Sequence, residues 1–454
     1  MYAAQNRAGR NGERSMTIFA LSSPPGKGGV AVFRVSGPAA LNSYHALTKR
    51  KKSLPPRKAT YCRMMHPVSG DVIDRGLAVY FQAPASFTGE DVVEYYTHGG
   101  TAGVAAMLAA LGACEGLRPA EAGEFTKSAV LNGKLDLTEA EAVGDMINAE
   151  TEIQHQLAAA QYEGSLKQLY DGWTARLVQM LAYQEAEIEF PDEDMPDGIA
   201  EELRPQIAEL LADMRAHLDD ARKGERLREG LKIVILGPPN AGKSSLLNAL
   251  AKRDVAIVSE TAGTTRDVIE AHLNLGGYAV TLTDTAGLRG ETQDAIEKEG
   301  MARARSHAAE ADLKVFLFDA AEGFDKAFFK EIDVQTLLVA NKTDAAENVK
   351  LPEGVLPLSV KTGDGLTFFL KRLTDELAQR WALPKDHAPL LTRQRHRDTL
   401  EESAAALEQS LAAELPELAA EDLRLALRAL GRLTGRVDVE ALLDVIFRDF
   451  CIGK

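Results

Sequence analysis

The stretch GPPNAGKS at residues 237–244 decides the fold of the central part of the chain. It follows the pattern G-x-x-x-x-G-K-[ST], in which glycines let backbone N–H groups converge on phosphate oxygens. The apolar run 231–236 precedes it, and a helical pattern over residues 245–251 follows it. This strand-loop-helix context predicts a phosphate loop in which Lys243 reaches the β and γ phosphates and the Ser244 hydroxyl binds Mg²⁺.

Three further motifs follow along the chain in the order that a GTPase domain requires. DTAG (284–287) and NKTD (341–344) each end an apolar run, and SVK (359–361) completes a loop on the base side. A carboxylate at Asp344 can accept the N1–H and 2-amino protons of guanine, whereas adenine lacks this donor pair and would leave the carboxylate unpaired. The four motifs together predict a GTPase domain.

The hydrolytic chemistry differs from that of Ras-like enzymes. The residue after DTAG is Leu288, where those enzymes carry a glutamine that orients the attacking water. Leucine has no polar atom for this role, so we expect another water-orienting group and another positive charge. The sequence offers Glu297 and the polar loop 259–267. A solvated carboxylate at a helix start is the alternative interpretation of Glu297.

The pattern of the sequence changes along the chain. Residues 16–133 alternate short β-like runs with turns, and one helix is expected at 101–114. A T-x-x-E capping box at Thr138 and Glu141 predicts the start of a long helical segment. Apolar runs separated by helical segments then predict a mostly parallel sheet, and helix returns after residue 384.

The expected fold is multidomain α/β and α, with a compact α/β domain inserted into a loop of a helical domain. Strands are expected at residues 16–21, 29–35, 77–81, 92–96, 231–236, 271–283, 313–318, 336–340 and 355–359. The expected boundaries are 1–15 for a disordered extension, 16–133 for an N-terminal α+β domain, 134–228 with 385–454 for a discontinuous helical domain, and 229–384 for the inserted Ras-like P-loop GTPase domain.

Composition places the chain of 454 residues among ordinary globular proteins. Its net charge of −15 does not favour nucleic-acid binding through net charge alone. The longest apolar run, 104–114, is shorter than the ~18 residues that a membrane span needs, and three cysteines are too few for a disulfide framework. We therefore expect a cytoplasmic protein without a membrane span. The basic stretch 49–58 is either a solvated loop or a patch that contacts phosphates.

Several stretches resemble one protein family. The polar loop SETAGTTRD (259–267), with Asn240 in the phosphate loop, resembles the potassium-activated GTPases of the MnmE, Era and Der group. The stretches PPGKGGVAVFRVSG (24–37) and FCIGK (450–454) narrow the resemblance to the MnmE family. Further stretches similar to that family are FTGEDVVE (87–94), HGG (98–100), PAEAGEFT (119–126) and LNGKLDL (131–137).

The resemblance implies a potassium-activated GTPase that modifies tRNA together with an MnmG-type FAD-binding partner. It implies a homodimer formed through an N-terminal tetrahydrofolate-binding domain, and a heterotetramer with that partner. The implied product carries a carboxymethylaminomethyl or aminomethyl group at carbon 5 of the wobble uridine of certain tRNAs. The one-carbon unit would come from a reduced folate, 5-formyl- or 5,10-methylene-tetrahydrofolate, and GTP, Mg²⁺ and K⁺ complete the implied ligands.

The resemblance also assigns roles to residues. Glu297 is implied to orient water, and Cys451 to act in the chemistry, although a lone cysteine is more often a small buried apolar residue. The implied metal ligands are Asn240, Ser259, Thr261 and Thr264 for potassium, and Ser244 and Thr265 for magnesium. The implied folate-binding residues are Arg34, Glu94, Lys134 and Lys454. The motifs and the resemblance together assign GTP binding to Asn240, Ala241, Gly242, Lys243, Ser244, Ser245, Ser259, Thr264, Thr265, Asp284, Thr285, Ala286, Gly287, Asn341, Lys342, Asp344, Ser359 and Lys361.

Two other functions fit parts of the sequence. A ribosome-assembly or signalling GTPase of the Era or Der type would share the nucleotide motifs, and a folate-dependent enzyme acting on a small metabolite would share the N-terminal ones. No basic RNA-binding domain follows the GTPase motifs, and the chain carries FCIGK at 450–454 instead. The sequence therefore favours the tRNA-modification interpretation.

Overall fold

The structure is a computed structural model of the chain. Its chain divides into two compact units, residues 1–144 with 431–454 and residues 145–430. The described residues are 16–189, 199–253, 256, 270–284, 311–323, 336–346, 350–384, 388–437, 443, 446–447 and 450–453.

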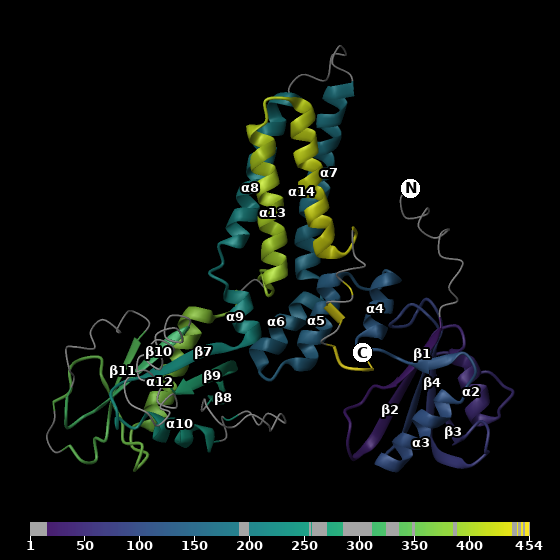
Figure 1. The fold of residues 1–454 in the computed structure, drawn as a ribbon, viewed down its shortest axis with the longest axis horizontal. Helices are drawn as coiled ribbons and strands as arrows, with labels where there is room; N and C mark the ends of the chain where they lie inside the picture. The colour runs from purple at the N-terminus through teal and green to yellow at the C-terminus, as the bar shows by residue number, and fades with distance from the viewer. Residues whose placement is uncertain are drawn as a thin grey trace, which may run out of the picture. The chain divides into compact units, whose positions relative to one another are not determined.

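The first unit contains a six-stranded sheet with the order β3-β4-β5-β2-β1-β6 (Figure 1). Neighbouring strands are antiparallel except for β1 and β6, which are parallel. The strands are β1 (Thr17–Leu21), β2 (Gly28–Ser36), β3 (Thr60–Met65), β4 (Val72–Phe81), β5 (Val92–Gly99) and β6 (Leu117–Pro119).

Two helices pack against the sheet and form the core of this unit together with it, α2 (Ala40–Thr48) and α3 (Thr101–Gly112). Side chains alternate between the two faces of a strand, so one face of the sheet packs its buried Phe33 and Tyr95 with Met107 and Leu111 of α3 in one apolar cluster. The other face carries Arg34 of β2 and Glu94 and Tyr96 of β5. A third helix, α4 (Glu124–Leu131), follows β6.

The second unit contains a six-stranded sheet with the order β12-β11-β10-β7-β9-β8. All its described neighbours are parallel except β8 and β9, which are antiparallel. The strands are β7 (Leu231–Leu236), β8 (Glu270–Leu275), β9 (Tyr278–Asp284), β10 (Leu313–Asp319), β11 (Thr336–Asn341) and β12 (Leu356–Pro357).

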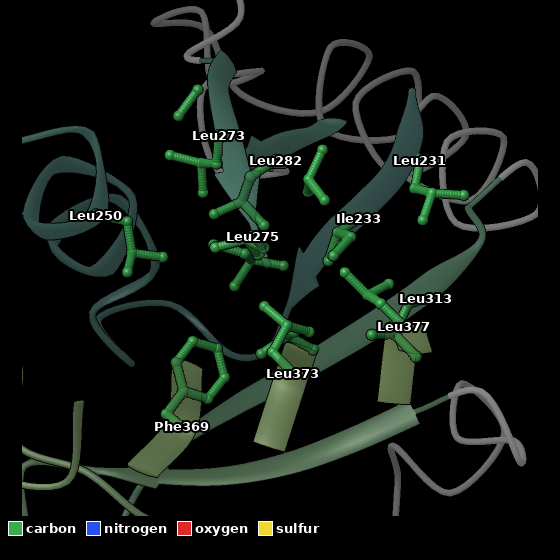
Figure 2. Close-up of a cluster of buried hydrophobic side chains, with 14 of the residues drawn as sticks. Leu231, Ile233, Leu250, Leu273, Leu275, Leu282, Leu313, Phe369, Leu373 and Leu377 are labelled. Carbon is green, nitrogen blue, oxygen red and sulfur yellow. The ribbon is translucent and has the colours of Figure 1, made fainter. Parts of the chain in front are cut away.

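One face of this sheet packs against α10 (Lys243–Ala251) and α12 (Leu366–Trp381). Figure 2 shows Phe369, Leu373 and Leu377 of α12 directed at leucines of the sheet. Fully burying a side chain of this kind contributes about 1.5–3 kcal/mol. This core fixes the central strand β7, and therefore the loop that follows it.

The remaining described helices belong mainly to a helical part of the chain (Figure 1). In the second unit α8 packs against both α7 and α13, and α6 packs against α7. The bounds are α5 (Leu137–Asn148), α6 (Glu152–Tyr162), α7 (Ser165–Glu189), α8 (Ile199–Leu218), α9 (Lys223–Glu229), α13 (Gln394–Ala412) and α14 (Pro416–Thr434). Within the described residues, no helix is both long and apolar enough to cross a membrane.

The predicted capping box at Thr138 and Glu141 is wrong. Helix α5 begins at Leu137, and both of those residues are buried inside it. The reciprocal cap lies two residues earlier: the Glu139 amide donates to Asp136 Oδ1 at 2.8 Å, and the Asp136 amide donates to Glu139 Oε2 at 2.7 Å. The pattern D-x-x-E satisfies the same free amides as T-x-x-E.

Three other details also differ from the prediction. The single strand expected at 271–283 is a hairpin, because Gly276 and Gly277 adopt φ of 61° and 92° and form its turn. Sequence analysis also missed strands β3 and β6. It missed helices α2 and α4 as well, since it expected only one helix before residue 133.

Candidate functional site

The phosphate loop lies between the central strand β7 and helix α10 (Figure 1). Strand β7 pairs with β9 on one side and β10 on the other, which makes its carboxyl end the switch point where open α/β sheets bind ligands. Gly237 has φ of 139°, and a Cβ atom there would lie 1.9 Å from the carbonyl oxygen of Leu317. Only glycine allows the loop to cross β10 this closely.

Lys243 is held inside the phosphate loop. Its side chain donates to the carbonyl oxygens of Gly237 and Pro238, both at 2.9 Å, and the residue is only 6% exposed. The ammonium group therefore lies against the loop that would surround the phosphates. Asn240 adopts φ of 62°, a left-handed conformation that asparagine tolerates better than most residues.

Asn341 connects the phosphate loop to the base-side loop. Its Nδ2 donates to the carbonyl oxygen of Ala241 at 2.7 Å, and its Oδ1 accepts from the amide of Val360 at 3.1 Å. Asn341 is 3% exposed, and a Cβ atom at Gly242 would lie 2.3 Å from its Nδ2. The side chain thus holds the two loops together, and this contact requires glycine at position 242.

Asp344 is oriented by a buried serine. Ser359, which is fully buried, donates its hydroxyl to Asp344 Oδ1 at 2.7 Å, while Lys361 Nζ lies 4.0 Å from Asp344 Oδ2. The Ser359 hydroxyl also accepts from the amide of Thr362 at 3.2 Å. The carboxylate is 21% exposed and remains accessible to a base. Two acceptor oxygens in a fixed plane fit the paired donors of guanine.

Lys342 pairs with a residue that sequence analysis did not select. Its Nζ lies 2.8 Å from Asp319 Oδ2 at the end of β10. This hydrogen bond from Lys342 is the main cause that holds the pKa of Asp319 below its ordinary value. Asp319 pairs with Asn341 in the register of β10 and β11, so the strand-end position is the signal that could have found it.

Part of the predicted nucleotide site lies outside the described residues. Asp284 ends β9 opposite Ile235 of β7, so the backbone places it beside the start of the phosphate loop. Ser245 lies in the first turn of α10 with Ser244. The predicted residues outside the described ranges are Ser259, Thr261, Thr264, Thr265, Thr285, Ala286, Gly287, Glu297 and Lys454.

A second group of predicted residues lies on the first unit's sheet. Arg34 of β2 and Glu94 of β5 are register partners, and Arg34 Nε donates to Glu94 Oε1 at 3.0 Å. The Tyr96 hydroxyl donates to the other oxygen, Oε2, at 2.7 Å. The Arg34 guanidinium lies 5.4 Å from the ring centre of Phe87 and 5.7 Å from that of Phe125. The side chains of Arg34 and Glu94 are 16% and 12% exposed.

Sequence analysis missed the aromatic residues of this group. Tyr96 lies two positions from Glu94 on the same strand, so the period of two could have placed it on the same face. Burial, and then the hydrogen bond to Glu94, raise the pKa of Tyr96 to about 12. Its phenol therefore stays protonated and donates to the carboxylate.

Lys134 and the chain around Cys451 lie in the same unit. Lys134 Nζ donates to the carbonyl oxygen of Pro84 at 3.1 Å. Ile452 pairs with Ala122, and the carbonyl oxygen of Gly453 accepts from the Ser22 hydroxyl at 3.0 Å. The segment before Lys454 thus lies against the end of β1, the strand next to the one that carries Arg34.

Cys451 is exposed, so the interpretation of it as a buried apolar residue is wrong. The backbone of Cys451 is hydrogen-bonded: the amide of Gly123 donates to the Cys451 carbonyl oxygen at 3.4 Å. The other two cysteines, Cys62 and Cys114, are buried, and burial raises the pKa of both thiols. Cys451 is therefore the one accessible thiol among the three cysteines.

Comparison with known proteins identifies the family. The family model described as the MnmE helical domain matches residues 137–451, and the model described as the GTP-binding protein TrmE N-terminus matches residues 17–134. The chain belongs to the MnmE family. The resemblance inferred from the sequence is thereby confirmed, as is the fold class of an N-terminal α+β domain, a helical domain and a P-loop GTPase domain.

Relatives within the MnmE family match almost the whole chain. The tRNA modification GTPase MnmE of Parvibaculum lavamentivorans is 52% identical over 442 residues, which cover 96% of this chain and all of the relative. The protein of the same name from Paramagnetospirillum magneticum is 50% identical and covers 97% of this chain and all of the relative. The one from Rickettsia bellii is 46% identical, with 96% and 100% covered.

Proposed function

We propose that this chain binds and hydrolyses GTP as a step in the modification of tRNA. Its membership of the MnmE family of tRNA modification GTPases supports this proposal. The observation that carries it is the arrangement around the Asp344 carboxylate. Ser359 fixes the orientation of this carboxylate by a hydrogen bond, and Asn341 connects the loop of Ser359 to the phosphate loop. This arrangement suits a guanine nucleotide and disfavours an adenine nucleotide.

Different residues of the chain would bind the phosphates, orient the base and orient the attacking water. The N–H groups at the start of α10 and the Lys243 ammonium would bind the phosphates, and the buried position of Lys243 excludes water from the ammonium. Asp344 would orient the base. Glu297 stays a prediction for the residue that orients the attacking water.

The donor atoms at the loop fit hard cations. Ser244 would hold Mg²⁺ through its hydroxyl, and Asn240 would offer a carboxamide oxygen to K⁺, since both ions prefer oxygen ligands. Bound beside the phosphates, these cations would neutralise the charge that develops during hydrolysis, as an arginine does in other GTPases. Thr265 for Mg²⁺, and Ser259, Thr261 and Thr264 for K⁺, stay predictions.

The N-terminal sheet would bind a reduced folate that supplies a one-carbon unit. Glu94 is the acceptor that suits the amino-pyrimidine edge of a pterin. Its Oε1 is taken by Arg34 Nε and Nη2, at 3.0 and 2.9 Å, whereas its Oε2 keeps a lone pair beyond the bond from Tyr96. Phe87 and Phe125 offer apolar surface beside this pair. Lys134 and Lys454 would contact the glutamate tail or the carbonyl oxygens.

We further propose that the modified position is carbon 5 of the wobble uridine. The product would carry an aminomethyl-type group, and the chain would act as a homodimer with an MnmG-type FAD-binding partner in a heterotetramer. The exposed thiol of Cys451, next to the segment that pairs with Ala122, is the candidate for a chemical role. The GTP cycle would drive a conformational step, since GTPase segments order around the γ-phosphate and relax after hydrolysis.

The test is a comparison of wobble-uridine nucleosides by mass spectrometry in tRNA from cells with and without this protein. We expect the carbon-5 modification to disappear without it. An unchanged profile, in cells with no redundant enzyme, would contradict the proposal and favour a ribosome-linked GTPase. The potassium assignment has its own test: GTP hydrolysis should be faster in K⁺ than in Na⁺ at equal ionic strength, and equal rates would remove it.

A further inference from the structure

A strongly basic surface interrupts the acidic chain in the N-terminal unit. Residues 49–75 contain eight Lys and Arg against two Asp, a net charge of +6 within a chain of net charge −15. We call the loop 49–58 together with Arg63 of β3 and Arg75 of β4 the basic rim. The loop joins α2 to β3, and β3 is the edge strand of its sheet (Figure 1).

Three contacts anchor the loop of the basic rim to the rest of its unit. Leu54, in its middle, is 2% exposed and belongs to the apolar core. At one end Lys49 Nζ donates to the carbonyl oxygen of Pro67, just after β3, at 2.8 Å. At the other end the Arg57 amide donates to the carbonyl oxygen of Tyr80 on β4 at 2.7 Å. The loop therefore spans the length of β3, which is about 20 Å for six residues.

Five of the charged side chains in the basic rim have no partner among the described residues. Within the described part of the chain, no ion pair or hydrogen bond involves the side chains of Lys51, Lys52, Lys58, Arg63 or Arg75, and all five residues are exposed. They stand at the surface as free positive charges. A partner that is to neutralise them must come from outside this region.

Two arginines in the basic rim oppose each other. Arg63 and Arg75 are direct register partners across β3 and β4, and like charges in this position destabilise a sheet. A charge on an edge strand protects against edge-to-edge pairing, which explains Arg63 on β3. It does not explain Arg75, because β4 lies inside the sheet between β3 and β5.

The same sheet face presents an aromatic side chain. Tyr61 lies two residues before Arg63 on β3, hence on the same face, and is 63% exposed. Exposed aromatic rings beside arginines are the groups on which unpaired RNA bases stack. Lysine is depleted at protein–protein interfaces, whereas nucleic-acid interfaces are rich in positive charge. The composition of the basic rim therefore fits RNA better than it fits an acidic protein.

We propose that the basic rim binds the phosphate backbone of RNA and is a contact surface for the tRNA substrate. This proposal rests on the proposed function and names a surface that would hold its substrate. The side chains of Lys51, Lys52 and Lys58 supply the phosphate contacts, and Arg63 and Arg75 lose their mutual repulsion when a phosphate lies between them.

The experiment measures binding of the full chain to tRNA as a function of salt. The test variant is Lys51→Ala, Lys52→Ala, Lys58→Ala, which leaves Leu54 and Arg57 in place to hold the loop. If each lysine makes one phosphate contact, the slope of log affinity against log salt should become less steep by about 2–3, and affinity at 100 mM salt should fall about 10- to 100-fold. The matched control is Lys252→Ala, Lys350→Ala, Lys371→Ala, which removes three other exposed lysines.

A second variant and two further readouts separate the outcomes. Arg63→Gln with Arg75→Gln should also weaken tRNA binding, while circular dichroism and GTP hydrolysis stay as in the original chain. Equal tRNA binding by the test and control variants would overturn the proposal while leaving the proposed function intact. Unchanged RNA binding combined with lost wobble modification would assign the basic rim to a protein partner. An original chain that neither binds nor modifies tRNA would contradict the proposed function itself.

Discussion

Removing the Ser359 hydroxyl should weaken the binding of guanine nucleotides. Ser359 is fully buried, and its hydroxyl donates to Asp344 Oδ1 at 2.7 Å while it accepts from the Thr362 amide at 3.2 Å. In Ser359→Ala, Asp344 loses the bond that fixes its plane, and the Thr362 amide loses its acceptor. A hydrogen bond to a charged group contributes about 1.5–3 kcal/mol.

This free energy corresponds to binding of GTP that is about 10- to 100-fold weaker, since 1.4 kcal/mol is a factor of ten in affinity. Inosine triphosphate lacks the 2-amino group and can donate only one of the two protons to Asp344. The original chain should therefore prefer GTP over the inosine nucleotide, and Ser359→Ala should reduce that preference because the carboxylate no longer faces both donors.

The assay is a fluorescence titration with labelled GDP, followed by competition with GTP and inosine triphosphate. The matched control is Thr362→Val, which removes a hydroxyl from the same loop. This hydroxyl donates to Oδ2 of the exposed Asp364 at 2.7 Å and does not contact Asp344. We expect this control to bind GTP within about threefold of the original chain. If Ser359→Ala also binds GTP within that range, the serine does not position the carboxylate.

Three further predictions concern other sites. Gly242→Ala places a Cβ atom 2.3 Å from Asn341 Nδ2, so the variant should lose nucleotide binding in the same titration while its far-ultraviolet circular dichroism stays unchanged. Burial lowers the pKa of His217 to about 4. As the pH falls below ~6.5, His217 therefore becomes protonated in the unfolded chain but stays neutral in the folded chain. The free energy of unfolding from His217 should fall by on the order of 3 kcal/mol between pH 7 and pH 4, and His217→Leu should flatten this part of the urea-denaturation profile. Cys451→Ser should abolish tRNA modification and spare GTP hydrolysis; full modification by the variant would remove the chemical role of the thiol.

Sequence alone predicted the strands of the GTPase sheet well because buried parallel strands are short apolar runs with clear ends. The runs at 231–236 and 313–318 match β7 and β10 to within one residue. The run at 271–283 was wrongly predicted as one strand. Apolar segments lie on both sides of the Gly276–Gly277 turn, so the sequence resembles a single strand interrupted by glycine. Neighbouring glycines with positive φ are the signal that divides such a run.

The N-terminal unit was harder to predict because its elements are short and its strands are half exposed. Strand β3 carries TYCRMM, which alternates exposed and buried residues, but only Cys62 and Met64 are buried, so its apolar signal is short. Helix α4 starts at Glu124 after Gly123 in a left-handed conformation, without a side-chain cap that sequence analysis could detect. Packing against the rest of the unit determines such elements, and a local pattern does not contain that information.

The candidate sites show the same division between local and tertiary information. A motif names the residues that a ligand needs, and the phosphate loop and Asp344 were predicted in this way. The bonds that hold these groups in place, from Ser359 to Asp344 and from Arg34 to Glu94, form only when separate segments of the chain meet. Asn341 illustrates the consequence: sequence analysis assigned it to the nucleotide, while its two hydrogen bonds go to backbone groups of Ala241 and Val360. A substitution there should act through the geometry of both loops, so the motif residue and the positioning residue can be told apart only in the folded chain.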